Sequence, residues 1–88
     1  MMTEQKHREV QAQVDVVTLC GDELRTAIAR QVSYGSRFIF LIEEGKSSMF
    51  VLREAQRASE DATHEVGVAM RALRIAQKEL KQIEAGWW

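Results

Sequence analysis

Four basic residues near the C-terminal end of the chain are the strongest candidates for a ligand site. They recur at spacings of three, four and three residues: Arg71, Arg74, Lys78 and Lys81. These spacings place them on one helix face, where neighbouring like charges oppose helix formation by roughly 0.2–0.5 kcal/mol per pair. The helix macrodipole favours only the members nearest the C-terminus. The row therefore predicts binding of a phosphate-bearing ligand, a nucleotide or nucleic acid, or of an acidic protein.

A second interpretation of this basic row needs no ligand. If the first and last helices are antiparallel, Glu4, Glu9 and Asp15 fall beside the row and neutralise it through ion pairs. Most charged rows on helices are solvated or paired in this way. The formal net charge of -1 gives no overall attraction to nucleic acid, so a phosphate site would depend on the local arrangement of charge.

Each of the two histidines follows an acidic residue by three positions. Glu4 precedes His7 and Asp61 precedes His64, so each acid shares a helix face with its histidine. Di-iron carboxylate bundles bind metal with this arrangement, but they add further carboxylates in the bundle interior. His64 lies away from the apolar repeat that begins at Leu52. A metal-binding helical bundle is therefore an alternative function, and no residue is assigned as a metal ligand.

The sequence contains no recognisable catalytic motif. Its single thiol, Cys20, has no nearby histidine and is expected to pack as a small apolar residue beside Val17 and Leu24. There is no glycine-rich phosphate loop, CxxC pair or serine nucleophile motif. We therefore expect a protein that is not an enzyme and that uses no cofactor. A lone cysteine and an N-terminus without an apolar leader fit a cytoplasmic protein.

Aromatic side chains offer a different kind of site, a docking surface for another protein. They lie in the middle of the chain and at its end: Tyr34, Phe38, Phe40, Phe50, Trp87 and Trp88. We expect Gly86 to follow the last helix, with Trp87 folding back onto Ile83 in a Schellman-type contact. Trp88 is then an interface anchor or a loose end. Tyr34, expected beside a turn, contacts a ligand or covers one end of the core.

The element that must carry the basic row is a long helix. From Leu52 to Trp87 an apolar or small residue recurs at alternating spacings of three and four, and only Ser59 is polar. This repeat is typical of a helix buried along one stripe against another helix. Every second member is an alanine: Ala55, Ala62, Ala69 and Ala76. Because small residues let backbones approach, we expect a closely spaced antiparallel helix pair, within one chain or between two copies.

A first helix is expected over residues 3–32. Its apolar residues follow helical spacing: Val10, Val14, Val17, Leu24 and Ile28. Gly21 fills the missing position of this series, where glycine costs about 1 kcal/mol relative to alanine. The glycine predicts either a kink, with Asp22 capping a restarted helix, or a position where another helix crosses closely.

A turn is expected at residues 33–36, because Gly35 can adopt the left-handed conformation and Ser36 can cap the next element. The next segment, residues 37–46, is apolar at first and turn-like at its end. It predicts either a short buried helix or one strand of a small β-hairpin completed by residues 49–52. The helix is favoured, because an isolated two-stranded hairpin is only marginally stable. Either form must be covered on more than one side.

Together these patterns predict one all-α domain over residues 1–88. It consists of two long antiparallel helices with a short apolar middle segment, the second helix covering residues 47–85 with Ser47 or Ser48 as its N-cap. A chain of this size has a small core, so we expect a helical bundle or coiled coil completed by self-association into a homodimer or larger oligomer.

The expected function depends on this architecture. We expect a small protein-interaction module, such as an adaptor, chaperone or inhibitor, that docks on an unidentified protein partner. The longest apolar run, Phe38–Ile42, is too short to span a bilayer, so no membrane partner is expected. The long repeat covers about 50 Å, more than a first helix bent at Gly21 can pair with, which predicts apolar surface left for a partner.

Overall fold

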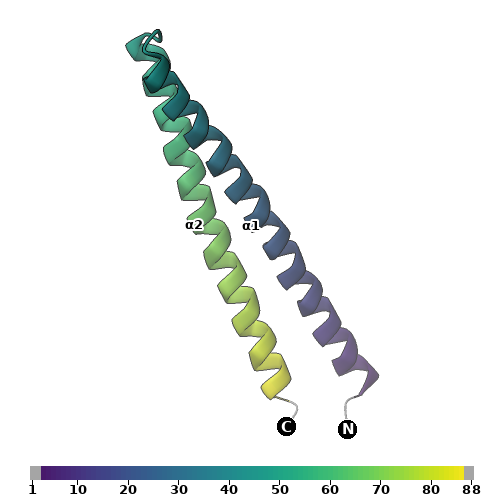
Figure 1. Ribbon diagram of the computed structural model, residues 1–88. Coiled ribbons are helices and arrows are strands. Elements are labelled where there is room, and N and C mark those ends of the chain that lie inside the picture. Colours follow the sequence, from purple (N-terminus) through teal and green to yellow (C-terminus); the bar gives the residue numbers. More distant parts are fainter. Residues whose placement is uncertain (1–2, 87–88) are drawn as a thin grey trace.

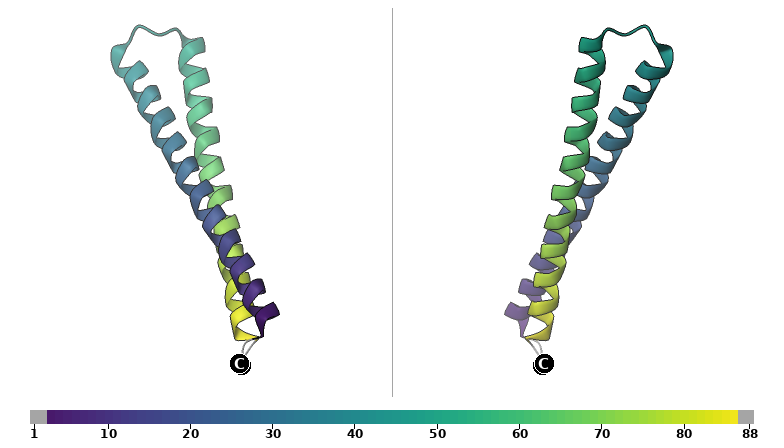
Figure 2. Two further views of the ribbon diagram at one scale, coloured as in Figure 1. Left: turned by 90° about the vertical axis from the view of Figure 1, so that its right-hand side faces the viewer. Right: turned by 90° about the vertical axis from the view of Figure 1, so that its left-hand side faces the viewer.

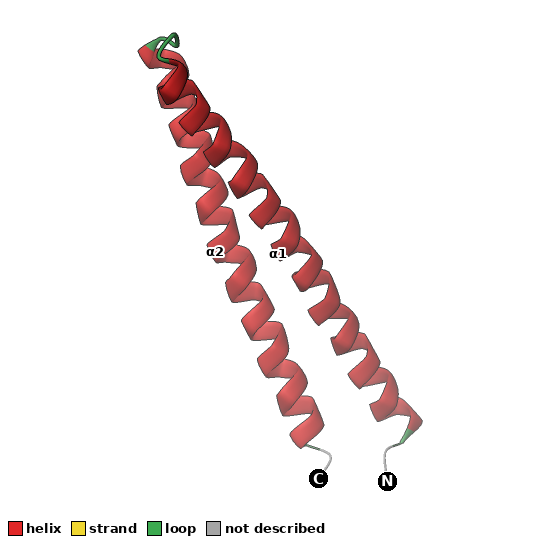
Figure 3. Cartoon of the chain, viewed as in Figure 1, coloured by secondary structure: helices red, strands yellow, loops and turns green. Residues whose placement is uncertain are grey.

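The computed structural model describes residues 3–86, and these residues form two helices and no strand. Helix α1 (Glu4–Glu44) and helix α2 (Met49–Ala85) run antiparallel and are joined by a short loop at residues 45–48 (Figures 1 and 3). The expected pair of long antiparallel helices is therefore confirmed. Within the described residues, neither helix combines the length and apolar content that a membrane span requires.

The hairpin is a thin rod. It measures 67 × 15 × 14 Å with a radius of gyration of 19.6 Å, whereas a compact domain of this length has a radius of gyration of about 12 Å. In Figure 1 the helices overlap near the loop and lie side by side toward the termini. In the views of Figure 2, turned by 90°, they lie apart near the loop and overlap toward the termini. The two helices therefore wind around each other, as sustained heptad repeats require.

Both helices begin at a capping side chain. Thr3 Oγ1 accepts a hydrogen bond from the Lys6 backbone N–H at 3.2 Å, and Ser48 Oγ accepts one from the Val51 N–H at 3.3 Å. Of the two serines expected to cap the long helix, Ser48 does so. Gly45 ends α1 in the left-handed conformation, with a φ of 67°, and its N–H donates to the Leu41 carbonyl at 3.3 Å.

The expected turn at residues 33–36 is wrong, because α1 continues through it to Glu44. Gly45, not Gly35, is the glycine with positive φ among the described residues. A glycine inside a helix costs about 1 kcal/mol, which apolar residues on both sides offset by packing against α2. Most of residues 37–46 are thus the last turns of α1, so a helix is correct for this segment and the β-hairpin is wrong. The expected separate, buried helix is wrong as well, since the segment continues α1 and Ile39, Phe40 and Ile42 are exposed.

Neither a restart nor a close crossing occurs at Gly21. The chain stays helical there, and the Asp22 carbonyl accepts a hydrogen bond from Thr26 Oγ1 at 3.1 Å, so Asp22 is an interior helical residue and not a cap. A methyl group added at Gly21 would meet no heavy atom within 4 Å. The first helix therefore covers the whole length of α2, against our expectation that a bend would leave part of it uncovered.

The C-terminal end of α2 also differs from the expected cap. Gly86 follows the last helical residue, as expected, and its N–H donates to the Gln82 carbonyl at 3.0 Å. Its φ is -66°, which is right-handed, so the expected Schellman-type ending is wrong. Trp87 and Trp88, for which a folded-back contact and an interface anchor were expected, lie outside the described residues.

The contact between the helices is built on small residues. The expected alanine row is confirmed, since Ala55, Ala62 and Ala76 are only 9%, 2% and 3% exposed and Ala69 is half-buried. Ala27 is the buried residue of α1. The larger members of the repeat are only half-buried beside them: Leu52, Val66, Leu73, Leu80 and Ile83. We call this line of contact the alanine seam.

Two glutamines of α1 tie the helices together in one register. Gln13 Nε2 donates to the Ala76 carbonyl at 2.9 Å, and Gln31 Nε2 donates to Thr63 Oγ1 at 3.2 Å. Polar contacts between two helices favour the alignment in which both bonds form, because a slip of either helix breaks them. The first bond places the N-terminal part of α1 opposite the C-terminal part of α2, and the second joins residues nearer the middle of each helix.

Substituting two glycines should test where the chain turns. Gly45→Ala should lower the free energy of unfolding by about 1–2 kcal/mol, because an L residue is strained at positive φ. Gly21→Ala is the matched control, and it should raise the free energy of unfolding by about 1 kcal/mol through helix propensity. Urea denaturation at one fixed chain concentration measures both changes. A loss of stability at Gly21, or none at Gly45, would contradict the continuous first helix.

A larger side chain in the alanine seam should separate the helices. Ala62→Leu should cost about 1–3 kcal/mol of unfolding free energy, because a leucine does not fit between closely packed backbones. Ala12→Leu, at an exposed position of α1, is the control and should change stability little, since the two residues have similar helix propensity. If both substitutions were equally harmless, the seam would not be the contact that holds the hairpin.

Candidate interaction surfaces

The hairpin buries none of its large apolar side chains fully and leaves about half of those in residues 3–86 exposed. Among the described residues the buried core consists of four alanines, and no polar side chain is buried. The accessible surface is 6968 Å², whereas a compact monomer of the same mass exposes about 5,300 Å². The excess of about 1,700 Å² is twice the roughly 800 Å² that each partner contributes to a standard interface. The rod therefore has surface to spare for a docked chain.

One row of exposed apolar side chains follows the second half of α1. We call it the α1 stripe, and its four members are between 42% and 62% exposed: Ile28, Val32, Ile39 and Ile42. With Gly35 in the middle they repeat at spacings of four, three, four and three. Sequence reasoning missed this stripe, although its signal is a second 3,4 repeat, because the turn expected at residues 33–36 divides the row in two.

Apolar side chains also gather at the loop end of the rod. Phe40, Met49 and Phe50 are between 62% and 70% exposed and lie within a few residues of the loop. We call these three residues the tip. Two of the three phenylalanines expected to dock on a partner are therefore exposed near the loop, one on each helix, whereas Phe38 is half-buried.

Tyr34 lies in the interior of α1 and not beside a turn. It is partly exposed and lines a shallow hollow together with Ala58 and Asp61 of α2. The expectation that it covers a core end beside a turn is wrong, because the helix continues through this position. It lies less than two turns before Phe40 of the tip in the same helix.

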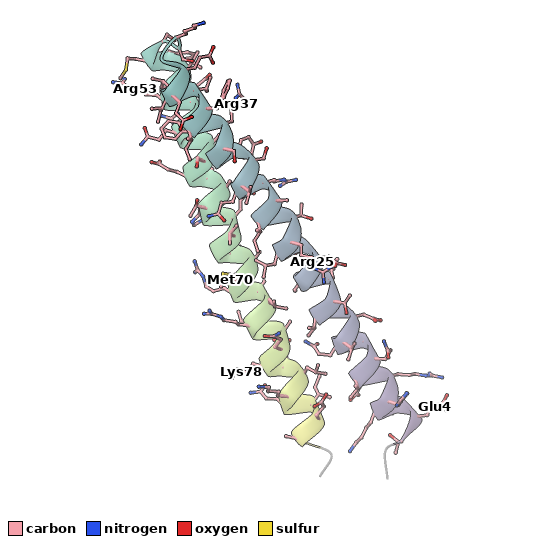
Figure 4. All side chains as sticks on the ribbon, in the orientation of Figure 1. Glu4, Arg25, Arg37, Arg53, Met70 and Lys78 are labelled. Atoms are coloured by element: carbon pink, nitrogen blue, oxygen red, sulfur yellow. The ribbon has the colours of Figure 1, made fainter. Side chains whose placement is uncertain are left out.

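The basic row lies on the outer side of α2. Arg71 and Lys78 each follow an alanine of the seam by two residues, about 200° around the helix, so they point away from α1. All four members of the row are exposed. Figure 4 shows Lys78 on the side of α2 that is turned away from α1.

The expected ion pairs between the basic row and the N-terminal acids are absent from the described part of the chain. Glu4 pairs with Arg8 at 3.0 Å, and Asp15 accepts a hydrogen bond from Gln11 at 3.0 Å. The three salt bridges among residues 3–86 involve none of the four basic residues of the row. The pairing interpretation is wrong because the row faces away from the helix that carries the acids.

A shallow groove of about 520 Å³ runs between the helices on the side opposite the α1 stripe. Its floor is formed by small residues, and charged side chains stand at its rim, where Arg30 Nη1 lies 3.6 Å from Glu65 Oε2. The lining residues are Asp22, Glu23, Thr26, Ala27, Arg30, His64, Glu65, Val68, Ala69 and Ala72. An open groove of this kind can receive a side chain of another protein.

The histidines are not brought together with other metal ligands. Within residues 3–86 no group of three or more His, Cys, Asp or Glu side chains is close enough to hold a metal ion. His7 lies near the start of α1 and His64 in the middle of α2, both exposed. Cys20 is half-buried with a free thiol. The described side chains thus add no support to a metal-binding bundle.

Comparison of the chain with protein-family models, with curated proteins and with solved structures finds no match.

Proposed function

We propose that this chain is a non-enzymatic protein-interaction module that acts as a helical homo-oligomer and docks on another protein through its apolar surface. The observation that carries the proposal is the contrast between a core of four alanines and the large apolar side chains left exposed. Burial of such side chains in an interface is favourable by about 25 cal/mol of free energy per Å² of apolar surface removed from water. A rod that exposes this many of them is suited to binding other helices.

The small area buried within one chain supports self-association. The unfolded chain of 10.1 kDa exposes about 14,600 Å², so the hairpin hides only about half of that surface. Even a domain of 60 residues buries about 60% and is then marginally stable. A second copy of the hairpin would supply the missing burial.

The tip is the part of the surface best suited to a different protein. Phe40 and Phe50 each offer about 150–250 Å² of apolar surface, and aromatic anchors of this kind dominate binding energy at interfaces. Phe40 and Phe50 lie near the loop end of the rod (Figure 1), and neither belongs to the α1 stripe. An oligomer whose copies pair along that stripe would thus leave both aromatic rings free for a different protein.

Truncating either phenylalanine of the tip should weaken partner binding and leave oligomerisation intact. Phe40→Ala and Phe50→Ala should each weaken binding of the purified partner, first isolated from the host with the unmodified chain, by about tenfold or more. The control pair is Val16→Ala and Ile75→Ala, which removes apolar side chains that are also exposed but far from the tip. Calorimetric titration measures the affinities. Equal losses in both pairs, or none in the first, would contradict docking through the tip.

A second candidate function is binding of a phosphate-bearing ligand, a nucleotide or nucleic acid. It is favoured by one observation: the four exposed cations of the basic row form no salt bridge with a carboxylate among residues 3–86. Their repulsion is left uncompensated in the hairpin, and phosphate groups would relieve it.

Salt should separate this second candidate from apolar docking. If the row binds phosphates, log K for a fluorescent single-stranded oligonucleotide should fall with log salt with a slope of about -3, since about four phosphates are neutralised. Arg71→Gln with Arg74→Gln should roughly halve that slope. Lys6→Gln with Arg8→Gln, which removes two cations from α1, is the control. Oligonucleotide binding that is unchanged by Arg71→Gln with Arg74→Gln and by 0.5 M salt would contradict the phosphate site.

A further inference from the structure

We propose that two copies of the hairpin pair through the side that carries the α1 stripe, forming an antiparallel four-helix bundle whose two-fold axis passes beside Gly35 and Ser59. This inference rests on the proposed function and deepens it, because it names the occupant of the stripe and the geometry of the complex. The occupant is a second copy of this chain.

The α1 stripe is nearly symmetric about Gly35. Its members lie seven and three residues before the glycine and four and seven residues after it. Antiparallel pairing of α1 with a second α1 about this point therefore sets Ile28 opposite Ile42 of the second copy, and Val32 opposite Ile39. Every large apolar side chain of the stripe then meets another. A self-complementary row is what a two-fold interface requires.

Helix α2 has its own symmetric row, centred on Ser59. Pairing two copies of α2 about this serine sets Met49 opposite Met70 and Leu52 opposite Val66. The polar residues between them also match, since Gln56 falls opposite Thr63. Apolar side chains meet apolar ones and an amide meets a hydroxyl. The second row therefore fits a two-fold rotation of the same kind as the first.

The two centres coincide in the hairpin, although each was located from its own helix. A methyl group at Gly35 would lie 3.9 Å from Ser59 Oγ, so the midpoints of both rows are at the same level of the rod. One two-fold axis can therefore relate both pairs of helices at once. Both centres are small residues, which allows the second copy to approach closely at the axis.

The two rows also lie on the same side of the hairpin. Members of the α1 stripe follow seam residues by one position, as Ile28 follows Ala27, and Met70 follows Ala69 in the same way on α2. In an antiparallel pair of right-handed helices, a step of about 100° past the seam leads to one common side. Groove residues such as Thr26 and Val68 precede the same seam residues and lie on the other side.

Gly35 is not required by the hairpin itself. Its φ is not positive, and an added methyl group would make only an ordinary contact with Ser59. Yet glycine costs a helix about 1 kcal/mol relative to alanine. The space above this glycine is therefore left for something outside the hairpin, and at the centre of the α1 stripe a second backbone fills it.

Charge selects the antiparallel arrangement over the parallel one. Arg25, which also lies 3.5 Å from Asp22 of its own helix, stands just before the α1 stripe, and Glu43 and Glu44 stand just after it, all exposed. Antiparallel pairing brings Arg25 of one copy beside the two glutamates of the other. A parallel pair would set like charges against each other at both ends of the stripe, which is unfavourable.

Mixed disulfides test this geometry directly. In a Cys20→Ser background, chains carrying Val32→Cys are mixed with chains carrying Ile39→Cys and oxidised. The mixed disulfide should exceed the statistical half of the cross-linked product, and the same should hold for Met49→Cys mixed with Met70→Cys. Thr26→Cys mixed with Val68→Cys, on the groove side, is the control and should give little cross-linked product. Homodisulfides as abundant as mixed ones would overturn the antiparallel pairing.

A charge placed in the stripe gives a second test that does not depend on oxidation. Val32→Glu should raise the dissociation constant of the dimer by more than about 100-fold, because a buried unpaired carboxylate is strongly unfavourable. Val68→Glu, on the groove side, is the control and should leave the mass measured by light scattering at two chains. Circular dichroism checks that both variants remain helical.

The outcomes separate this inference from the proposed function. A dimer that survives Val32→Glu and cross-links through Thr26 and Val68 would overturn the arrangement but leave self-association in place. An unmodified chain that stays monomeric at micromolar concentration would overturn both. If the unmodified chain is a monomer and Val32→Glu abolishes its binding to a different protein, the stripe is the docking site of that protein. This result would overturn the pairing of two copies.

Discussion

Alanine at every seventh position of α2 brings the two helix backbones close together, and this contact determines where all other side chains can lie. Ala62 and Ala76 are almost fully buried, so no large side chain fits on the line between the helices. Many of the larger apolar side chains among residues 3–86 therefore stand exposed to either side of the seam or at the tip. Because a methyl group buries little area, close packing leaves the hairpin with a weak core and an apolar exterior.

The part of the fold that depends on periodicity could be predicted from the sequence. The 3,4 repeat, the alanine row and the cap at Ser48 all depend on contacts within or between helices that spacing alone describes. The position of the turn could not, because Gly35 and Gly45 are chemically identical. Which of the two becomes left-handed depends on whether the apolar residues between them pack against α2, and that is a tertiary contact.

The candidate surfaces were harder to predict for the same reason. The exposure of the basic row follows from its offset from the alanines. That Glu4 pairs with Arg8 and not with this row could be learned only from the structure, in which the row faces away from α1. The α1 stripe becomes visible only when the helix is continuous from Ile28 to Ile42. Its symmetry about Gly35 acquires meaning once the structure sets that glycine beside Ser59, since neither row alone locates a two-fold axis.

The central claim is that one hairpin is incomplete and that a second copy supplies the missing burial. Thermal unfolding of the unmodified chain, followed by circular dichroism over a hundredfold range of chain concentration, tests it most directly. If folding is coupled to association, the midpoint temperature rises steadily with concentration by mass action. A midpoint that stays the same over the whole range would show that a single hairpin folds on its own and would contradict the account.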